Sequence, residues 1–272
     1  MKIPFSKMNG AGNDFVVLDN RDHSLDLTRE QIAQLCDRHR GVGADGLLAV
    51  EPAERGADAR FRYYNADGGE AEMCGNGARC FAAYLNRLVD GSGDPLTFET
   101  IAGTLTATFH GTDVEIAMSD PVDFQRGAQL DLGQDGATTT VDSVNTGVPH
   151  AVVSTDDIDA FDIVSAGAAI RYHEHFAPSG TNANVFQPIG DSAIRIRTYE
   201  RGVENETLAC GTGMVACALV HHQNTDCASP VAVTVKGGDT LQIGFEHQGD
   251  LNYQKVTLCG PADFVFQAEI DL

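Results

Sequence analysis

Two copies of one short motif divide the chain into halves. Each copy reads Cys-Gly-x-Gly and continues into a small, apolar run: CGNGARCFAAYL from Cys74 and CGTGMVACALV from Cys210. The two cysteines lie 136 residues apart (210 − 74), half of the 272 residues. Three further pairs keep a similar offset in the same order: AGNDFVVLD with TGVPHAVVSTD, FETIAGTLTATF with VTVKGGDTLQIGF, and SDPVDF with CGPADF. Four ordered matches predict two copies of one unit, facing each other about a pseudo-twofold axis.

Both halves show the same predicted order of elements. The Val-rich segments DFVVLD and HAVVST are typical of short strands, and ARFRYYN and AIRIRTYE alternate as strands do. Thr28 and Gln31 form a capping box before a helix, and Ala160–Phe176 is the corresponding helix of the second half. We expect an α+β fold of two pseudo-symmetric halves, each a central helix wrapped by mixed and antiparallel strands. The halves are residues 1–118, completed by 261–272, and residues 119–260, with the active site in the cleft between them.

The charge balance excludes one class of partner. The chain has 39 acidic against 18 basic residues, a net charge of −21, so it lacks the basic patch that nucleic-acid binding needs. Its acids are dispersed and its lysines few, a pattern typical of the acidic surfaces of salt-loving organisms. No apolar run approaches the roughly 20 residues that span a bilayer, and the N-terminus lacks the apolar region of a signal peptide. We expect a cytoplasmic protein that binds neither nucleic acid nor membrane.

The seven cysteines follow neither a disulfide nor a zinc pattern. In a chain without a secretion signal, an odd number of cysteines argues against a disulfide framework. Cys74 and Cys80 are spaced C-x5-C, and Cys210 and Cys217 are spaced C-x6-C, unlike the C-x2-C knuckle of structural zinc sites. The sequence therefore predicts thiols and no metal site.

A cysteine directly before a helix sits where unpaired backbone N–H groups and the helix dipole favour negative charge. Such a position lowers a thiol pKa from about 8.5 towards roughly 3.5–7.5, and the neighbouring glycines let an anion approach the backbone. The alternative for each cysteine is an inert thiol buried beside a glycine turn. Recurrence of Cys74 and Cys210 at the same place in both repeats favours chemistry.

The predicted symmetry suggests what that chemistry is. Facing repeats would place two thiols on opposite sides of one substrate carbon, so that one thiolate removes a proton and the other thiol returns one. This inverts a stereocentre by general acid–base catalysis. Pyridoxal-dependent racemases use a Schiff-base lysine instead, and the four lysines of this chain, at positions 2, 7, 236 and 255, offer no evident site for one.

Seven motifs together resemble the diaminopimelate epimerase family, in order from Phe5 to about Phe264: FSKMNGAGNDFVVLD, GVGADGLL, YNADGGEAEMCGNGARC, GVPHAVV, NANVF, YERGVENETLACGTG and the terminal GP stretch. The resemblance implies an isomerase that needs no pyridoxal or other cofactor. It also implies conversion of LL- to meso-diaminopimelate in lysine biosynthesis, a fold of two similar halves, and a homodimer.

The resemblance also implies roles for individual residues. Cys74 and Cys210 match the catalytic base and acid, while His150 and Glu200 match residues that tune or orient the two thiols. The helix starts that hold the reacting carboxylate are matched by Gly75, Asn76, Gly211 and Thr212, and the other substrate-binding positions by Asn13, Asn65, Asn184, Glu200 and Arg201. Read alone, Asn65 is also compatible with a simple turn, His150 with a surface turn, and Glu200–Arg201 with a solvated pair.

Two departures from the family pattern leave the substrate more open than the reaction. Gly46 stands where many members have Gln, and Val148 where many have Asn. The nearest alternative is a proline racemase or hydroxyproline epimerase, although those enzymes typically read Cys-Gly-His-Gly where this chain has Asn76. A thiol redox or metal-binding protein is an alternative of another class, and it would predict bound zinc or a working disulfide.

The acidic surface predicts that salt stabilises the fold. Concentrated salt shortens the Debye length to about 3 Å at 1 M and so screens repulsion among the excess negative charges. We expect the thermal unfolding midpoint to rise between dilute buffer and about 2–3 M KCl, measured by circular dichroism. A midpoint that is unchanged or lower would contradict the halophilic interpretation of the surface.

Overall fold

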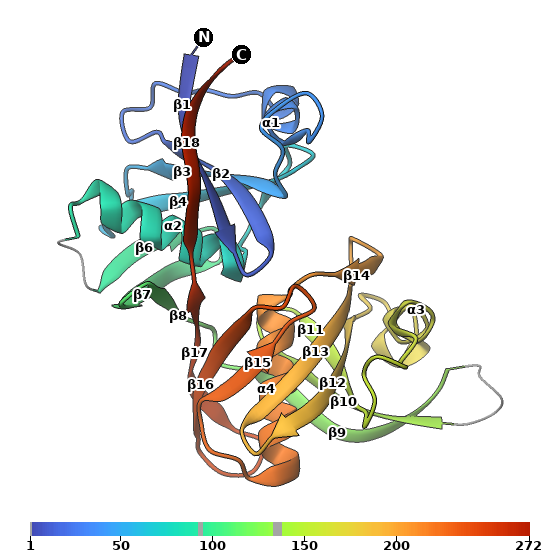
Figure 1. Cartoon of the computed structure of the whole chain (residues 1–272). Coiled ribbons are helices and arrows are strands. Elements are labelled where there is room, and N and C mark those ends of the chain that lie inside the picture. The colour runs from blue at the N-terminus through green and yellow to red at the C-terminus, as the bar shows by residue number, and fades with distance from the viewer. Residues whose placement is uncertain (1, 92–94, 133–137) are drawn as a thin grey trace. The chain divides into compact units, whose positions relative to one another are not determined.

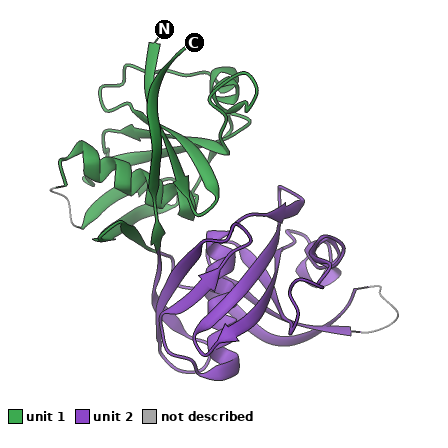
Figure 2. Cartoon of the chain, viewed as in Figure 1, with its two compact units in different colours: residues 1–117, 260–272 green, residues 118–259 purple. Residues whose placement is uncertain are grey.

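Each Cys-Gly-x-Gly motif opens a helix, as the sequence predicts. In the computed structural model, which describes residues 2–91, 95–132 and 138–272, α2 spans Gly75–Leu88 and α4 spans Gly211–Thr225. The chain divides into two compact units (Figure 2). Unit 1 is Met1–Ala117 with Gly260–Leu272, and unit 2 is Met118–Cys259.

Unit 1 contains eleven elements, and Figure 1 labels all of them except β5. They are β1 (Lys2–Gly10), β2 (Asn13–Asp19), α1 (Arg29–Cys36), β3 (Gly46–Glu51), β4 (Ala59–Asn65), β5 (Glu70–Ala71), α2, β6 (Leu96–Thr100), β7 (Gly103–His110), β8 (Asp113–Ala117) and β18 (Asp263–Asp271).

Unit 2 repeats that order after its first strand. Its elements are β9 (Val122–Asp131), β10 (Thr138–Asn145), β11 (Pro149–Ser154), α3 (Ile163–Arg171), the 3-10 helix η1 (Glu174–Phe176), β12 (Asn182–Gly190), β13 (Ala193–Glu200), β14 (Asn205–Thr207), α4, β15 (Val231–Thr234), β16 (Thr240–His247) and β17 (Tyr253–Pro261).

The two units pair their strands in the same way. In unit 1, β18, β1 and β2 run antiparallel in turn, β2 is parallel to β3, β3 is antiparallel to β4, β4 is parallel to β6, and β6, β7 and β8 form a meander. Unit 2 repeats every one of these relations with β9, β10, β11, β12, β13, β15, β16 and β17. Two parallel pairings at equivalent places fix the same curved sheet around each helix.

Each sheet encloses one helix. Helix α2 contacts β1, β2, β3, β4 and β8, and α4 contacts β10, β11, β12, β13, β15 and β16. Every residue from Gly213 to His222 is buried, so α4 is covered on all sides. An apolar helix without a polar face is stable only inside a core. Small residues make the enclosure tight: a Cβ on Gly10 would lie 2.8 Å from the Asn76 carbonyl oxygen.

The N-terminal caps of α1 and α3 determine where these two helices begin. Thr28 and Gln31 form the predicted capping box of α1, and Ile32, Leu35 and Cys36 are buried on one face. The predicted helix over Ala160–Phe176 is shorter, because the Asp162 side chain caps α3 by accepting the Ser165 N–H, and α3 ends at Arg171 before η1. None of the helices among the described residues is long and apolar enough to cross a membrane.

The core of unit 1 predicts the cost of a cavity. Phe81 of α2 is wholly buried, with its ring centroid 5.0 Å from those of Phe61 and Phe98. We expect Phe81→Ala to lower the free energy of unfolding by about 3–5 kcal/mol, measured by urea denaturation. Ile101→Ala, at an exposed position of the same unit, should change it by about 0.5 kcal/mol or less. Equal effects would contradict the assignment of Phe81 to the core.

Candidate active site

In unit 1, Cys74 is the N-cap of α2. Its backbone is extended, with φ −141° and ψ 119°, and its Sγ accepts the Gly77 N–H at 3.5 Å. The first N–H groups of a helix have no partner within the helix, so the N–H groups of Gly75 and Asn76 belong to this unsatisfied set. The thiol and these donors therefore share one positive helix end.

Four side chains form one hydrogen-bonded chain at this helix start. The Asn76 amide donates to Asn13 Oδ1 at 2.6 Å, and the Asn13 amide donates to Asp45 Oδ2 at 3.0 Å. At the other end, the buried Arg79 guanidinium donates to Asn76 Oδ1 at 3.0 Å. A carboxylate and a guanidinium thus terminate the chain and fix which way both amides point. Asp45 itself is held by Arg38 at 2.7 Å.

Asn65 lies at the end of β4, opposite Gly46 of β3. The Tyr63 hydroxyl donates to Asn65 Oδ1 at 2.9 Å. A Cβ on Gly46 would stand 2.7 Å from the Tyr63 ring and 2.6 Å from the Tyr64 carbonyl oxygen. A larger residue at position 46 would therefore displace the Tyr63 ring, whose hydroxyl holds Asn65. The glycine that replaces the Gln of many family members is thus required by the packing of Tyr63 in this chain.

In unit 2, Cys210 is the N-cap of α4 and is buried. The next residues, Gly211 and Thr212, supply the first N–H groups of the helix. The Thr212 hydroxyl lies 3.6 Å from Cys210 Sγ, within hydrogen-bonding distance for sulfur. The Thr146 hydroxyl donates to the Thr212 carbonyl at 2.8 Å and ties this helix start to the loop before β11.

His150 connects this helix start to the sheet. Its Nε2 lies 2.8 Å from Thr212 Oγ1, and its Nδ1 lies 3.0 Å from Asn184 Nδ2. Asn184 also donates to the Ala151 carbonyl at 3.0 Å and accepts from the Thr198 hydroxyl at 2.9 Å. Burial and the nearby Arg201 charge lower the pKa of His150 to about 3, so the imidazole is neutral. His150 is a buried core residue, not the surface turn residue that its sequence context alone also allowed.

Glu200 and Arg201 follow each other at the end of β13. Burial raises the pKa of the Glu200 carboxyl above its usual 4.5. The Arg201 N–H is held by Asn182 Oδ1 at 2.8 Å, and its guanidinium donates to the Ser179 carbonyl at 3.1 Å. The raised pKa separates Glu200 from a solvated surface carboxylate.

Other thiols in the same helices differ from the two at the helix starts. Cys80 of α2 and Cys217 of α4 are completely buried. Burial raises the pKa of Cys80 to about 12 and that of Cys217 well above its usual value, so both remain protonated. A protonated thiol in an apolar core is a poor base, and these two cysteines pack rather than react.

Comparison with known proteins identifies the family. A model described as diaminopimelate epimerase matches residues 5–124 and 143–265. The chain belongs to the diaminopimelate epimerase family. It is 39% identical to the diaminopimelate epimerase of Aquifex aeolicus, over 98% of both chains, and 40% identical to that of Chlorobaculum tepidum, over 97% of this chain and all of the other. Membership of this family makes the chain an isomerase.

Solved structures confirm the α+β fold of two halves. A hydroxyproline epimerase from Agrobacterium vitis superposes with a TM-score of 0.70 at 17% identity, covering 99% of this chain and 92% of the other. A PhzF-family phenazine biosynthesis protein from Bacillus anthracis gives 0.71 at 16% identity over the whole of both chains. At such low identity these similarities extend to the fold alone.

Within each unit the structure brings together several of the residues that the diaminopimelate epimerase pattern singles out. In unit 1 these are Asn13, Cys74, Gly75 and Asn76, and in unit 2 they are His150, Asn184, Cys210, Gly211 and Thr212. Asp45, Arg79 and Thr198 contact residues of these two sets, and Tyr63 contacts Asn65. The sequence alone did not single out any of these four residues. Asp45 and Arg79 lie within the family motifs, yet nothing in the sequence distinguishes them from ordinary turn and helix residues.

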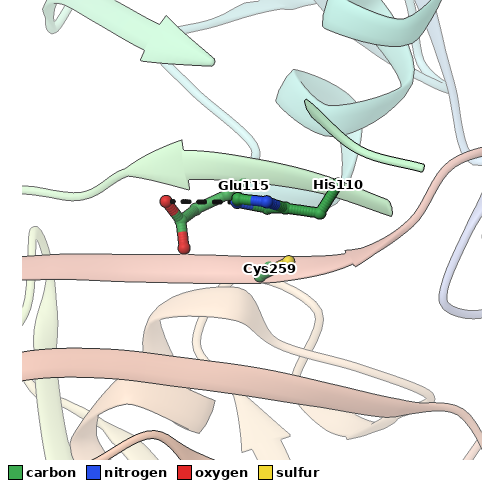
Figure 3. Close-up of side chains that lie close together, drawn as sticks. All are labelled: His110, Glu115 and Cys259. Atoms are coloured by element: carbon green, nitrogen blue, oxygen red, sulfur yellow. Dashed lines mark ion pairs between the residues drawn. The ribbon is translucent and has the colours of Figure 1, made fainter. Parts of the chain in front are cut away.

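The hairpin β7–β8 carries the ion pair drawn in Figure 3. His110 Nε2 lies 3.7 Å from Glu115 Oε1, both in unit 1. His110 is exposed, and solvent screens such a pair to about 0–1 kcal/mol. We assign this pair no role in the reaction.

The neutral His150 predicts how stability depends on pH. The unfolded chain takes up a proton at this histidine below about pH 6.5, whereas the folded chain does so only near pH 3. The contribution of His150 to the free energy of unfolding is therefore lost as pH falls from 6.5 towards 3. Between pH 6.5 and 5 the loss is up to about 2 kcal/mol, at about 1.36 kcal/mol per pH unit.

The measurement compares urea unfolding of the wild type and His150→Gln at several pH values. The variant should be less stable at pH 7 and should show a shallower decline below pH 6.5, because Gln does not titrate. Parallel curves for the two proteins would mean that His150 titrates normally in the folded state.

Proposed function

We propose that the enzyme interconverts LL- and meso-diaminopimelate in lysine biosynthesis, with Cys74 and Cys210 as the two catalytic thiols and no cofactor. One observation carries the proposal: each thiol is the N-cap of the enclosed helix in one of two units with the same strand pairing. Membership of the diaminopimelate epimerase family supports the substrate.

The proposed reaction moves one proton at each thiol. One thiolate takes the proton from the α-carbon and becomes a thiol, and the carbanion charge spreads into the adjacent carboxylate. The other thiol gives its proton to the opposite face of that carbon and becomes a thiolate. The enzyme gains no net proton, and the two cysteines have exchanged protonation states. Two such interacting groups titrate as a pair.

The backbone at the helix starts supplies the stabilisation that this step needs. We assign the reacting carboxylate to the N–H groups of Gly75, Asn76, Gly211 and Thr212. Preorganised donors of this kind contribute about 2.7–4 kcal/mol each where they face developing charge. The unsatisfied N–H groups at the starts of α2 and α4 support this assignment.

The other polar residues are assigned to the rest of the substrate. We propose that Asn13, Asn65 and Asn184 bind its amino-acid ends and that Glu200 orients one thiol. Arg201 is assigned to the distal carboxylate, because a guanidinium pairs with a carboxylate through two parallel hydrogen bonds. His150 orients the other thiol.

Two coarser features belong to the same proposal. We expect a homodimer and a cytoplasmic location, in keeping with the family resemblance of the sequence. Light scattering coupled to size-exclusion chromatography measures the oligomeric state, and a monomeric mass would remove the dimer without affecting the reaction.

A proline racemase or hydroxyproline epimerase is the second candidate, because enzymes of that kind share the plan of two cysteines, one in each half. The two proposals separate on substrate. We expect activity on LL-diaminopimelate, little on L-lysine, which lacks the distal carboxylate, and none on L-proline or trans-4-hydroxyproline. Comparable kcat/KM for diaminopimelate and lysine would remove the role of Arg201, and turnover of proline would favour the second candidate.

Isotope incorporation tests the two-thiol mechanism. In D2O at low conversion, product should carry deuterium at the inverted carbon while recovered substrate carries almost none, because the incoming proton comes from the other, solvent-equilibrated thiol. Mass spectrometry of both pools measures this from either stereoisomer. Cys74→Ala and Cys210→Ala should each abolish epimerisation, whereas Cys227→Ala should retain most activity. Substrate that gains deuterium as fast as product forms would indicate a single base.

A further inference from the structure

Five side chains of unit 2 form one continuous polar chain that ends at a catalytic sulfur. Its links are Thr198 to Asn184 (2.9 Å), Asn184 to His150 (3.0 Å), His150 to Thr212 (2.8 Å) and Thr212 to Cys210 (3.6 Å). Thr198, Asn184 and His150 are each no more than 2% exposed. In a site so buried, every donor has to face an acceptor, so the direction of each link can be worked out.

The Ala151 carbonyl fixes the orientation of the Asn184 side-chain amide. Asn184 places the same side-chain atom 3.0 Å from this carbonyl oxygen and 3.0 Å from His150 Nδ1. A carbonyl oxygen only accepts, so that atom is the amide nitrogen and both of its hydrogens are committed. Asn184 Oδ1 then faces the Thr198 hydroxyl, which donates to it.

The Asn184 amide in turn fixes the tautomer of the His150 imidazole. His150 Nδ1 receives an Asn184 N–H and is therefore the unprotonated nitrogen. A neutral imidazole then carries its proton on Nε2, which donates to Thr212 Oγ1. The low pKa of His150, about 3, agrees with a neutral ring. Both ring nitrogens are thus occupied within the protein, and His150 acts by orientation rather than by taking the substrate proton.

The last link sets the state of the thiol. Because Thr212 Oγ1 accepts from His150, its own hydrogen remains available, and Cys210 Sγ is within reach. A thiolate can only accept a hydrogen bond, so this donor matches the deprotonated sulfur. We infer that the Thr212 hydroxyl donates to Cys210 Sγ and favours its thiolate, with Thr198 as a positioning residue at the far end of the chain. The catalytic part of this inference rests on the proposed function.

Other charges of unit 2 act on the same region. Arg201, directly after β13, acts on His150 of β11, Cys217 lies two turns along α4 from Cys210, and Glu200 at the end of β13 is the nearest carboxyl in sequence to Arg201. Thr212→Val also removes the acceptor of His150 Nε2, and Thr212→Ser, which keeps that acceptor, separates this loss from the removal of a methyl group.

The tautomer is the first test, and it uses wild-type protein without substrate. Long-range 1H–15N spectra distinguish protonated from unprotonated imidazole nitrogens, and His150→Gln identifies the signals. We expect Nε2 protonated and Nδ1 unprotonated from pH 6 to pH 8. A proton on Nδ1, or a charged ring, would reverse the chain and overturn the inference.

Alkylation kinetics are the second test. In a Cys74→Ser background, the pH dependence of iodoacetamide modification at Cys210, followed by peptide mass spectrometry, gives the apparent pKa of that thiol. Loss of a hydrogen bond of about 1 kcal/mol corresponds to a shift of roughly half to one pH unit. Thr212→Val should raise the apparent pKa by this amount, and Thr212→Ser, which keeps a hydroxyl, should restore it.

Thr225→Val is the matched control, because Thr225 donates to the His221 carbonyl at the other end of α4. It should leave the pKa of Cys210 unchanged. Thr198→Val should shift that pKa in the same direction as Thr212→Val, but less. An unchanged pKa in folded Thr212→Val would overturn the inference. Neither test uses substrate, so both can succeed if the assay on diaminopimelate fails, and both can fail if that assay succeeds.

Discussion

The enclosed helix is the constraint on which the rest of the structure depends. A helix enclosed by a sheet has most of its lateral surface satisfied by packing, but its first N–H groups find no partner within it. In α2 and α4 these groups lie directly after a cysteine N-cap. The same burial that stabilises each unit therefore leaves a positive helix end beside a thiol, and in the proposed mechanism core and chemistry share one element.

Much of the fold could be predicted because it depends on local patterns. The helices predicted after Cys74 and Cys210 do begin at the next residues, Gly75 and Gly211. The predicted capping box at Thr28 likewise starts α1. The predicted helix at Ala160–Phe176 was too long. The Asp162 cap that begins α3, and the separate turn at Glu174–Phe176, depend on one side-chain contact and not on apolar periodicity.

The contacts of the candidate site could not be predicted in the same way. Asn13 and Asn76 are 63 residues apart in the sequence, and Asn76 Nδ2 lies 2.6 Å from Asn13 Oδ1. No local sequence pattern at either position predicts this contact. Thr198 is an ordinary strand residue in the sequence, and Asp45 reads as part of a glycine-rich turn. Their orientation of Asn184 and Asn13 follows only from the pairing of strands around each helix.

The two thiols have unlike surroundings. Cys74 is partly exposed and accepts a backbone N–H, whereas Cys210 is buried beside a hydroxyl. In the proposed mechanism the resting enzyme has two forms, one with the proton on Cys74 and one with the proton on Cys210. Unlike surroundings give these forms different free energies, so one form predominates at rest. Each turnover leaves the other form behind, the one prepared for the reverse reaction. Before the next substrate of the same handedness can react, a proton has to pass from one sulfur to the other through solvent. In the proposed mechanism the enzyme thus retains a record of its last product, and this recovery is as much a part of each cycle as the inversion.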